Sequence, residues 1–591
     1  LLVVKVLFVN PSCLDPRVTD PDALQIPIGL YYLATELLDQ GWISGILNLA
    51  PAGPANPSAK GSAKKALNLF TQSIMQEKPD IIGFSVTSPT RINAMACADK
   101  ARQILPDSLI VFGGPGATFM ADFLFGACPA LDVIVKGEGE FSTGKLVHAA
   151  KKAKDRFATI HQTQAIRKEL AQDLDRIPGI VFRKGLNIHD TGQSELVKDL
   201  DTLSHPSRYF TYQHLSMSRG CPGRCTFCGS PKFWGTSLVR RHSPQWLFEE
   251  IKALVQKGVT HFFISDDTFT MDSDAVRQLC QKIIKADLGI TWNAISRVDY
   301  IDENVLGLMR RAGCIQISFG IESGAEPIKK ILGKPIDNDT CVAAFDKVRA
   351  AGILPRAYFI YGSPGETDAT IQESIDLMGR LGPLSTVFYM LVTFPGTALY
   401  NRALQKGWTH DGVWQKNIED LPWWELDPDM DFEQVKRWGD RLRQAFFSNL
   451  EEFVNRITRH PDKTSAPLHA DFLSRLAMTF SHGEYARDNR VRNAEQIAEN
   501  LFEKALQSYP CARAFQGLAM IQQKQKNFPK AMALLDKGLS HFPENKDLCV
   551  CMGVCLMNTG DFHNALTYFT PFAHDPALGQ YIKICKQKTR L

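Results

Sequence analysis

Two series of alternating strand and helix patterns constrain the fold of this chain more than any other feature. Over residues 1–150, short β-branched runs such as VVKVLFVN at 3–10 and IIGFSV at 81–86 alternate with amphipathic helical stretches. Strands joined by helices pair in parallel, because a crossover helix returns the chain to the same edge of the sheet. The sequence therefore predicts an α/β domain at 1–150 with a doubly wound parallel sheet of five strands.

The carboxyl ends of these five expected strands are rich in Gly, Ser, Thr and Pro. They are 10–12, 49–51, 85–88, 113–116 and 137–140. Ligands of doubly wound sheets bind beyond such ends, where small residues let a large flat or phosphate-bearing ligand approach the backbone. Ordinary turn formation favours the same residues, so both interpretations stay open for this domain taken alone.

A second alternating series begins near Tyr212 and continues to about residue 425. Its six expected strands are YQHLSMS, HFFIS, ITWNAI, IQISFG, RAYFIYG and STVFYMLVT. This pattern predicts a partial (βα)6 barrel at 211–425, with an active site at the carboxyl ends of the strands. The strands lead into Cys221, Asp266, Ser296, Glu322, the turn GSPGET at 362–367, and Thr393. Because all six ends carry polar, turn-forming or thiol residues, a site is favoured over a merely polar rim.

The rest of the chain divides into a connector at 151–210, a helical region at 426–490 and a repetitive region at 491–591. The connector contains a helical pattern near 164–175 and a short extended GIVFRKG that turns at Gly185. In the last region, the pairs Ala519 and Gly553, and Ala531 and Ala565, are each 34 residues apart. A helical period of this length resembles tetratricopeptide repeats, which serve as packing scaffolds or bind a partner protein.

Composition excludes several classes of protein. The 67 Lys and Arg nearly balance the 63 Asp and Glu, with no long basic run, so no nucleic-acid partner is expected. No stretch reaches the roughly 20 apolar residues of a membrane span, and the opening LLVVKVLFVNP is not typical of a signal peptide. Most of the 14 cysteines are scattered singly, unlike a secreted disulfide framework. We expect a multidomain cytoplasmic protein without a membrane span.

Three cysteines need a separate explanation, because SRGCPGRCTFCGS at 218–230 places Cys221, Cys225 and Cys228 in one turn. Zinc and an iron–sulfur cluster are the candidate ligands for such thiolates. A structural zinc ion needs four ligands, so His214 or His242 would have to supply the fourth. A [4Fe-4S] cluster held by three thiolates keeps one iron open for another molecule.

The motif C-x3-C-x2-C, with Phe227 before its last cysteine and a barrel strand before its first, resembles that of the radical S-adenosylmethionine (radical SAM) superfamily. The resemblance implies a [4Fe-4S] cluster on Cys221, Cys225 and Cys228, whose open iron binds S-adenosylmethionine. FFISDDTFT, NAISR, FGIESG and GSPGET resemble further segments of that family. By this resemblance, the S-adenosylmethionine site comprises Phe227, Asp266, Asp267, Thr268, Ser296, Arg297 and Glu322.

The amino-terminal domain resembles the cobalamin-binding domain that precedes the barrel in cobalamin-dependent radical SAM enzymes. IPIGLYYLATELLDQG, VFGGPGAT and VIVKGEGE carry this likeness. The first loop reads NPSCLDPRV and lacks the D-x-H-x-x-G motif that provides a cobalt-ligating histidine in other cobalamin proteins. The resemblance implies cobalamin contacts at Ser85, Thr87, Gly113 and Gly114.

The two resemblances together imply an enzyme that cleaves S-adenosylmethionine reductively to a 5'-deoxyadenosyl radical and methylates an unactivated carbon. Cyclisation or rearrangement is the alternative, and a non-catalytic metal-binding scaffold is a more distant one. The expected partners are a small-molecule or peptide substrate, an electron donor such as flavodoxin or ferredoxin, and a protein bound by the repeats. No acid, base or radical relay is assigned, and Tyr361 and Tyr389 are interpreted as barrel packing.

Overall fold

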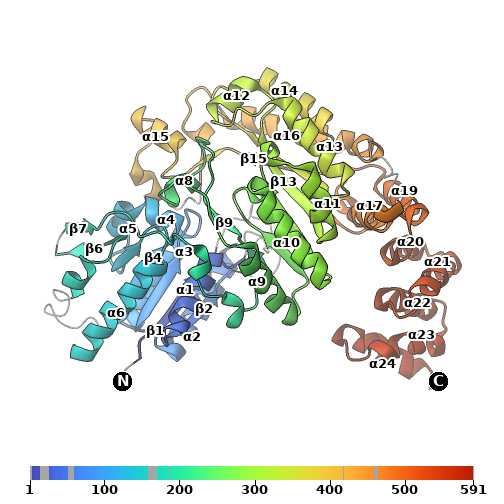
Figure 1. Ribbon diagram of the computed structural model, residues 1–591, viewed down its shortest axis with the longest axis horizontal. Coiled ribbons are helices and arrows are strands. Elements are labelled where there is room, and N and C mark those ends of the chain that lie inside the picture. Colours follow the sequence, from blue (N-terminus) through green and yellow to red (C-terminus); the bar gives the residue numbers. More distant parts are fainter. Residues whose placement is uncertain are drawn as a thin grey trace.

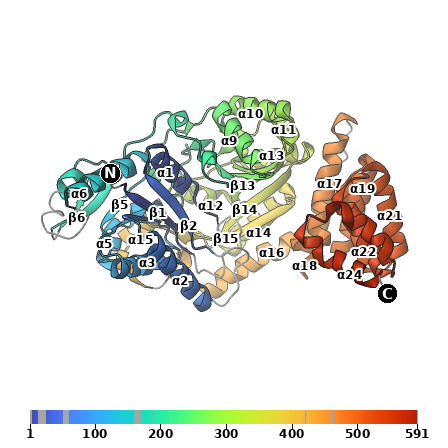
Figure 2. The ribbon, with the colours of Figure 1, turned by 90° about the horizontal axis from the view of Figure 1, so that it is seen from below.

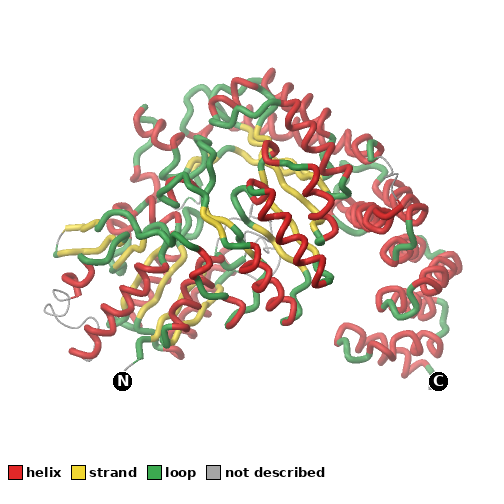
Figure 3. Tube along the Cα trace, in the orientation of Figure 1, coloured by secondary structure: helices red, strands yellow, loops and turns green. Residues whose placement is uncertain are grey.

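The computed structural model describes residues 3–12, 25–50, 59–157, 170–185, 187–416, 418, 420–457 and 463–589. Two sheets surrounded by helices lie next to each other, and the last part of the chain is entirely helical (Figure 1, Figure 3). Seen from below, these carboxyl-terminal helices form a separate layer beside the second sheet (Figure 2). Most of the NPSCLDPRV loop, Pro51 and the first half of the helix expected at 164–175 lie outside the described residues.

The first sheet confirms the doubly wound prediction. Its parallel strands are β1 (Lys5–Asn10), β2 (Ile43–Asn48), β3 (Ile81–Ser85), β4 (Leu109–Gly113) and β5 (Val133–Val135), in the order β2-β1-β3-β4-β5. Helices α1 (Ile28–Asp39) and α6 (Glu140–Phe157) pack on one face, and α2 (Ala59–Glu77) and α3 (Arg91–Ile104) pack on the other. The short helices α4 (Pro115–Phe119) and α5 (Ala121–Ala127) connect β4 to β5.

The segment GIVFRKG extends this sheet, which the sequence did not predict. β6 (Ile180–Lys184) pairs antiparallel with β5, and β7 (Asn187–Asp190) pairs antiparallel with β6, so the sheet has seven strands. The turn at Gly185 is where it was expected, with a left-handed φ of 68°. Ile180, Val181 and Phe182 are buried, and their burial explains why this short run joins the sheet.

The second sheet confirms the partial barrel. Its six parallel strands, in spatial order, are β15 (Ser385–Met390), β14 (Leu354–Tyr361), β13 (Cys314–Glu322), β12 (Thr291–Ser296), β11 (His261–Ile264) and β8 (His214–Leu215). Among the described residues β8 and β15 do not pair, so the barrel stays open. The intervening helices are α9 (Pro244–Gln256), α10 (Ser273–Ala286), α11 (Glu303–Arg311), α12 (Glu326–Ile331), α13 (Asn338–Ala350) and α14 (Asp368–Leu381).

The first barrel strand is shorter than the sequence suggested, because the chain bends after Leu215. Ser218 and Arg219 form β9 instead, which pairs antiparallel with β10 (Arg240–Arg241). Helix α8 (Ser230–Phe233) lies between β9 and β10 and follows the thiol loop. Beyond the barrel come β16 (Val392–Thr393), α15 (Ala398–Gln405), β17 (Leu421–Pro422) and α16 (Phe432–Asn455).

The carboxyl-terminal region consists of helices that pack on their neighbours in the chain. They are α17 (Ala466–Ser481), α18 (Glu484–Arg487), α19 (Ala494–Ser508), α20 (Ala512–Lys524), α21 (Phe528–His541), α22 (Lys546–Asn558), α23 (Phe562–Phe569) and α24 (Gly579–Lys588). Helices α20 and α22 begin 34 residues apart, as do α21 and α23. No described helix is both long and apolar enough to cross a membrane.

One partly buried carboxylate joins these helices to the barrel. Asp471 of α17 contacts Arg310 at the end of α11 at 2.6 Å, Arg475 at 2.8 Å and Arg513 of α20 at 2.6 Å. Burial alone would raise the pKa of Asp471, but the three guanidinium groups hold it well below its ordinary value. The barrel and the first carboxyl-terminal helices therefore share one electrostatic contact as well as one apolar core.

Candidate active site

The three thiols lie in the loop between β9 and α8, and two of them converge on Gly223. A Cβ placed at Gly223 would be 3.2 Å from Cys221 Sγ, 3.8 Å from Cys225 Sγ and 3.3 Å from Arg297 Nη1. The Gly223 amide donates a hydrogen bond to Cys221 Sγ at 3.3 Å, and the Ser230 amide donates one to Cys228 Sγ at 3.5 Å. The missing side chain at Gly223 thus leaves room beside two sulfur atoms and a cation.

The electrostatic surroundings of the thiols suit an anionic cluster. Burial raises the pKa of Cys225 and raises that of Cys228 to about 11, while Lys334 and Arg297 lower that of Cys225. Two cations next to the sulfurs would stabilise thiolates bound to iron. In the described chain, no three His, Cys, Asp or Glu side chains are grouped at the spacing of a single metal ion. The thiol loop is therefore not a preformed mononuclear site.

The loop is held in place by the segment that follows α12. The Thr226 amide donates to the Leu332 carbonyl at 2.9 Å, and the Thr226 hydroxyl donates to the Ile331 carbonyl at 3.0 Å. Gly333 has a left-handed φ of 68°, and a Cβ there would be 2.7 Å from the Arg224 carbonyl oxygen. Phe227 is partly buried against the apolar cluster that includes Ile328 and Leu332. Its ring anchors the loop to the barrel.

Asp266, Asp267 and Thr268, in the loop that follows β11, have different environments. Asp266 is buried, and its two carboxylate oxygens accept hydrogen bonds from the Met217 amide at 2.7 Å and the Ser218 hydroxyl at 2.6 Å. Burial raises the pKa of Asp266 to about 6 despite these hydrogen bonds. Asp267 Oδ2 accepts from the Ser230 hydroxyl at 2.6 Å, and Thr268 Oγ1 is 3.9 Å from Cys221 Sγ.

The side chains of Ser296 and Arg297, at the end of β12, point to different places: Ser296 contacts Thr270, and Arg297 faces the thiol loop. The Ser296 hydroxyl is buried against the Thr270 hydroxyl, at 2.5 Å. Arg297 is held by Asp299, which accepts from Nε at 3.0 Å and from Nη2 at 2.7 Å. This bidentate pair fixes the guanidinium plane and leaves Nη1 directed toward Gly223 and the thiols.

Glu322, at the end of β13, forms a buried ion pair with Lys334 at 2.8 Å. Its φ of 65° is left-handed, which is unusual for a residue with a side chain. A Cβ at Gly320 would lie 2.2 Å from Glu322 Oε1 and 2.4 Å from Lys334 Nζ, so any larger residue there would force the pair to shift. Lys334 lies close enough to Cys225 to lower the pKa of that thiol, so the ion pair adjoins the thiol loop.

The turn GSPGET contains a second buried carboxyl group. Glu366 Oε2 accepts hydrogen bonds from the Gly362 amide at 2.6 Å and the Ser363 amide at 2.9 Å. Burial raises the pKa of Glu366 to about 7, against the lowering effect of these two amides. Glu366 therefore fixes the shape of the turn after β14.

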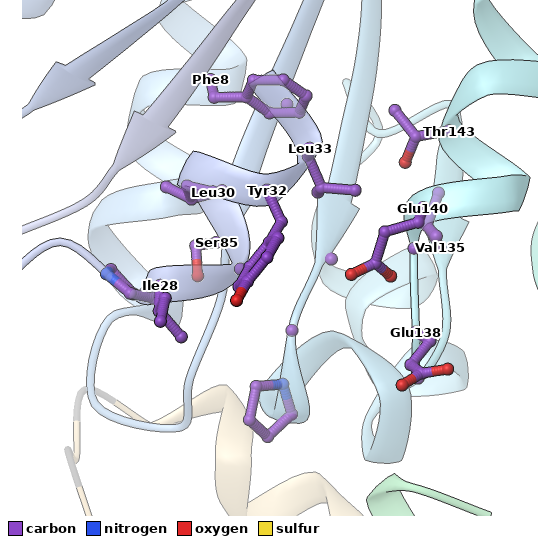
Figure 4. A pocket seen from close by; sticks show the side chains of 18 of the residues that line it. Phe8, Ile28, Leu30, Tyr32, Leu33, Ser85, Val135, Glu138, Glu140 and Thr143 are labelled. Atoms are coloured by element: carbon purple, nitrogen blue, oxygen red, sulfur yellow. The ribbon is translucent and has the colours of Figure 1, made fainter. Parts of the chain in front are cut away.

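A cavity of about 320 Å³ lies at the carboxyl ends of the first sheet (Figure 4). Ser85, Gly113 and Gly114 line it, so the structure brings together three of the four residues expected to contact cobalamin. Its apolar side is lined by Val6, Phe8, Leu30, Leu33, Ile81, Val111, Val135 and Leu146. Its barrel side includes Ser216, Ser218, Ser265 and Asp267. The cavity thus extends from the interior of the first sheet to the strand ends of the second.

Thr87, the fourth of these residues, lies in a different place. Its hydroxyl is 3.1 Å from that of Thr90, and it lines a neighbouring cavity of about 460 Å³. Phe119, Phe233, Trp234 and Phe394 line that second cavity as well. The second cavity lies between the α4 region and helix α8, next to the thiol loop.

Sequence reasoning missed a buried ionic junction between the two sheets. Arg219 pairs with Glu138 at 2.9 Å and with Glu140 at 2.8 Å, and Glu138 also accepts from Arg240 at 2.8 Å. Burial raises the pKa of Glu138, but the two arginines more than offset this and leave it below its ordinary value. The Arg219 guanidinium lies 5.0 Å from the centre of the Tyr32 ring. The segment KGEGE was the available signal, although its arginine partners are 81 and 102 residues away.

The two histidines considered for zinc have other partners. The His242 ring stacks on Trp246 with 3.7 Å between ring centres, and its Nε2 is 3.1 Å from the Tyr32 hydroxyl. The His214 Nδ1 is 3.4 Å from the Ser265 hydroxyl. These contacts do not favour either histidine as a fourth ligand beside Cys228.

Comparisons with known proteins agree with these two sites. Residues 215–378 match the model of the Radical SAM superfamily, and residues 18–146 match that of the B12 binding domain. The chain thus combines a B12-binding domain and a radical SAM domain.

Three curated relatives extend this finding. An uncharacterized methyltransferase, PH0819, of Pyrococcus horikoshii is 27% identical over 464 residues, covering 76% of this chain and 92% of the relative. A cytidylyl-2-hydroxyethylphosphonate methyltransferase of Streptomyces wedmorensis is 27% identical, covering 68% and 82%. An anaerobic magnesium-protoporphyrin IX monomethyl ester cyclase of Rubrivivax gelatinosus is 28% identical, covering 56% and 59%. The match thus spans about three fifths of the cyclase.

Two solved structures share the fold. One is the radical S-adenosylmethionine methyltransferase TsrM from Kitasatospora setae with cobalamin and a [4Fe-4S] cluster bound, at a TM-score of 0.57 and 16% identity, covering 85% of this chain and 100% of TsrM. The other is the cobalamin-dependent S-adenosylmethionine radical enzyme OxsB with aqua-cobalamin and S-adenosylmethionine bound, at 0.56 and 15%, covering 95% and 84%.

Proposed function

We propose that this protein is a cobalamin-dependent radical SAM enzyme that methylates an unactivated carbon of a small-molecule or peptide substrate. The observation that carries the proposal is the cavity at the carboxyl ends of the first sheet, which reaches Ser218 and Asp267 beside the thiol loop of the second. A methyl donor and a radical source can act on the same substrate only if their sites adjoin. The reach of this cavity toward the thiol loop meets that requirement. The two domain matches and the methyltransferases among the relatives support this reading.

The residues around the thiols fit a [4Fe-4S] cluster with S-adenosylmethionine on its open iron. When bound, the cluster supplies the electron that cleaves S-adenosylmethionine, and cobalamin supplies the methyl group. Cys221, Cys225 and Cys228 would hold three irons. Arg297 Nη1, directed toward two of the thiols, suits the methionyl carboxylate, and Glu322 suits the ribose hydroxyls.

The remaining residues of the proposed S-adenosylmethionine site form two groups: those free to contact the ligand and those already held by other parts of the protein. Asp267 is at the surface beside Cys228 and suits the methionyl ammonium group. Asp266 and Ser296 are buried against protein partners, so we assign them to positioning the thiol loop and the end of β12. Thr268 borders Cys221, and Phe227 fixes the loop.

The first cavity suits the nucleotide tail of cobalamin. Gly113 and Gly83 leave its floor without side chains, and its inner lining is aliphatic and aromatic, which suits the apolar base of a nucleotide tail. Gly114, with a φ of 92°, brings the backbone of the β4–α4 turn against Val86. Ser85 provides a hydroxyl at the same place.

Cyclisation is the second candidate, because the cyclase relative matches this chain at the same level of identity as the methyltransferases. Anaerobic reconstitution with iron, sulfide and cobalamin, followed by S-adenosylmethionine and a reductant, separates the outcomes. 5'-Deoxyadenosine together with S-adenosylhomocysteine supports methyl transfer, and 5'-deoxyadenosine alone supports cyclisation or rearrangement. Absence of 5'-deoxyadenosine would refute both.

For the carboxyl-terminal region at 491–591 we propose tetratricopeptide-like repeats that bind a protein partner. The 34-residue spacing of helix starts supports this assignment. So do close glycine–aromatic contacts, since a Cβ at Gly517 would lie 2.1 Å from Phe502, and one at Gly553 would lie 2.5 Å from Phe569.

An electron carrier such as flavodoxin or ferredoxin is the proposed source of electrons for the cluster.

A further inference from the structure

The inner face of the open barrel carries Arg356, a cation that forms no ion pair with any residue that the structure describes. Arg356 lies on β14, in register with Ser318 on β13, which is in register with Ile295 on β12. Their neighbours in the chain, such as Ala294, Ile317 and Ala357, are buried in the core on the opposite face. Side chains alternate between the faces of a strand, so Arg356, Ser318 and Ile295 share the inner face.

This inner face is exposed at two positions, although Ser318 at its centre is buried. Ile295 is 38% exposed, and Tyr389 on β15 is 47% exposed. Tyr389 was interpreted from the sequence as barrel packing, and its exposure corrects that interpretation, whereas Tyr361 is buried as expected. An uncovered apolar surface beside the cofactor residues is typical of a ligand site.

Aromatic side chains surround Arg356, and the carboxylate of Glu484 on α18 lies near the same Tyr485 hydroxyl that Arg356 influences. In the part of the chain that the structure describes, no hydrogen bond or ion pair is recorded for its guanidinium, and its Nε is buried without a partner. The guanidinium lies 5.8 Å from the centre of the Tyr358 ring, and Tyr358 meets Tyr389 edge to face at 5.8 Å. A partly desolvated cation without a counter-ion destabilises a fold unless a ligand supplies the anion.

We propose that this face binds the substrate and that the substrate is a carboxylate with a flat apolar group. The carboxylate pairs with the fork of Arg356, and the flat group packs on Tyr358, Tyr389 and Ile295. This inference rests on the proposed function, because it names the substrate class of the same site.

The strand geometry also sets the length of the substrate. Glu322, assigned to the ribose, is four residues beyond Ser318 on β13, which corresponds to roughly 13 Å along a strand. The carbon that reacts must therefore be on the order of 10 Å from the carboxylate. A free small amino acid is too short to bridge this distance, whereas an extended aromatic acid is long enough.

The test uses two fluorescent probes that differ in one group, 1-pyrenebutyrate and 1-pyrenebutanol, bound to the reconstituted full-length protein. We expect the acid to bind at least about tenfold tighter than the alcohol, as a charge-assisted pair would give. Arg356→Gln should abolish this preference without weakening the alcohol, and Arg356→Lys should keep part of it. Arg380→Gln, on the surface of α14, is the matched control and should retain the full preference.

Ser318→Asp provides a second variant that retains the arginine and places a carboxylate next to it. It should also remove the preference for the acid. Equal binding of acid and alcohol by the wild type, or an undiminished preference in Arg356→Gln or Ser318→Asp, would overturn the proposal. 5'-Deoxyadenosine formation in the same samples reports separately on the proposed function, since the probes need no turnover to bind.

Discussion

The two sheets place their sites at the same topological position but build them in opposite ways. At the carboxyl ends of the first sheet, Gly83, Gly113 and Gly114 leave space, and the cavity is lined mostly by backbone and apolar side chains. At the carboxyl ends of the second, Cys225, Arg297 and Glu322 bring reactive and charged groups together. Parallel sheets thus fix where a ligand binds, whereas side-chain volume and charge decide which ligand it is.

The comparison predicts that removing a functional side chain disables the site of the second sheet and leaves the cavity of the first sheet intact. Cys225→Ala should lose the optical band of the cluster and reduce 5'-deoxyadenosine formation by at least about a thousandfold, because an iron loses its thiolate. Cobalamin binding, measured by absorbance titration, should stay unchanged. Cys551→Ala, in α22, is the control and should retain both. Loss of cobalamin binding in Cys225→Ala would contradict the separation of the two sites.

Adding volume should disable the first site but not the second. A Cβ at Gly113 meets only the Val135 carbonyl oxygen, at 3.6 Å, so the position admits a side chain, and because Gly113 lines the cavity we expect the leucine of Gly113→Leu to occupy it. Cobalamin affinity should fall by at least about a hundredfold, while the cluster still forms. Gly45→Leu in β2, where no atom lies within 4 Å, is the matched control. Unchanged cobalamin affinity in Gly113→Leu would show that cobalamin binds elsewhere.

Added volume should also impair the second site at one position, because Gly320 makes room for the ion pair of Glu322 and Lys334. In Gly320→Ala the new Cβ meets Glu322 Oε1 at 2.2 Å and Lys334 Nζ at 2.4 Å, so the pair must move. We expect about tenfold weaker S-adenosylmethionine binding and a loss of about 1–3 kcal/mol of stability. Gly307→Ala, an open helical position in α11, should keep the affinity and lose no stability.

The smallest expected effect is a pH dependence from Glu366. Its folded-state pKa, about 7, is above the ordinary 4.5, so the folded protein holds this proton more tightly than the unfolded chain. The resulting stabilisation is complete below about pH 4.5 and is lost as the pH rises through 7. Thermal unfolding midpoints at pH 5.5 and pH 8 should therefore differ more in the wild type than in Glu366→Gln. Equal pH dependence in the wild type and in Glu366→Gln would show that a group other than Glu366 titrates.

The sequence predicted both sheets because their alternation of apolar strands and amphipathic helices is local in the chain. It also located the thiol loop and Arg297, which lie next to one another in the structure. It missed the Glu138–Arg219 junction, because ion pairs across 81 residues leave no periodic signal. It could not show that the oxygens of Asp266 already accept two hydrogen bonds within the protein.

The central claim is that one chain holds a radical source and a methyl donor at adjoining sites. The most direct measurement is anaerobic incubation of the cobalamin-loaded, cluster-containing protein with S-adenosylmethionine and a reductant, with mass-spectrometric analysis of the products. The account predicts 5'-deoxyadenosine from the wild type, none from Cys225→Ala, and 5'-deoxyadenosine without S-adenosylhomocysteine from Gly113→Leu. Failure of the wild-type protein to form 5'-deoxyadenosine, with its cluster intact, would contradict the account.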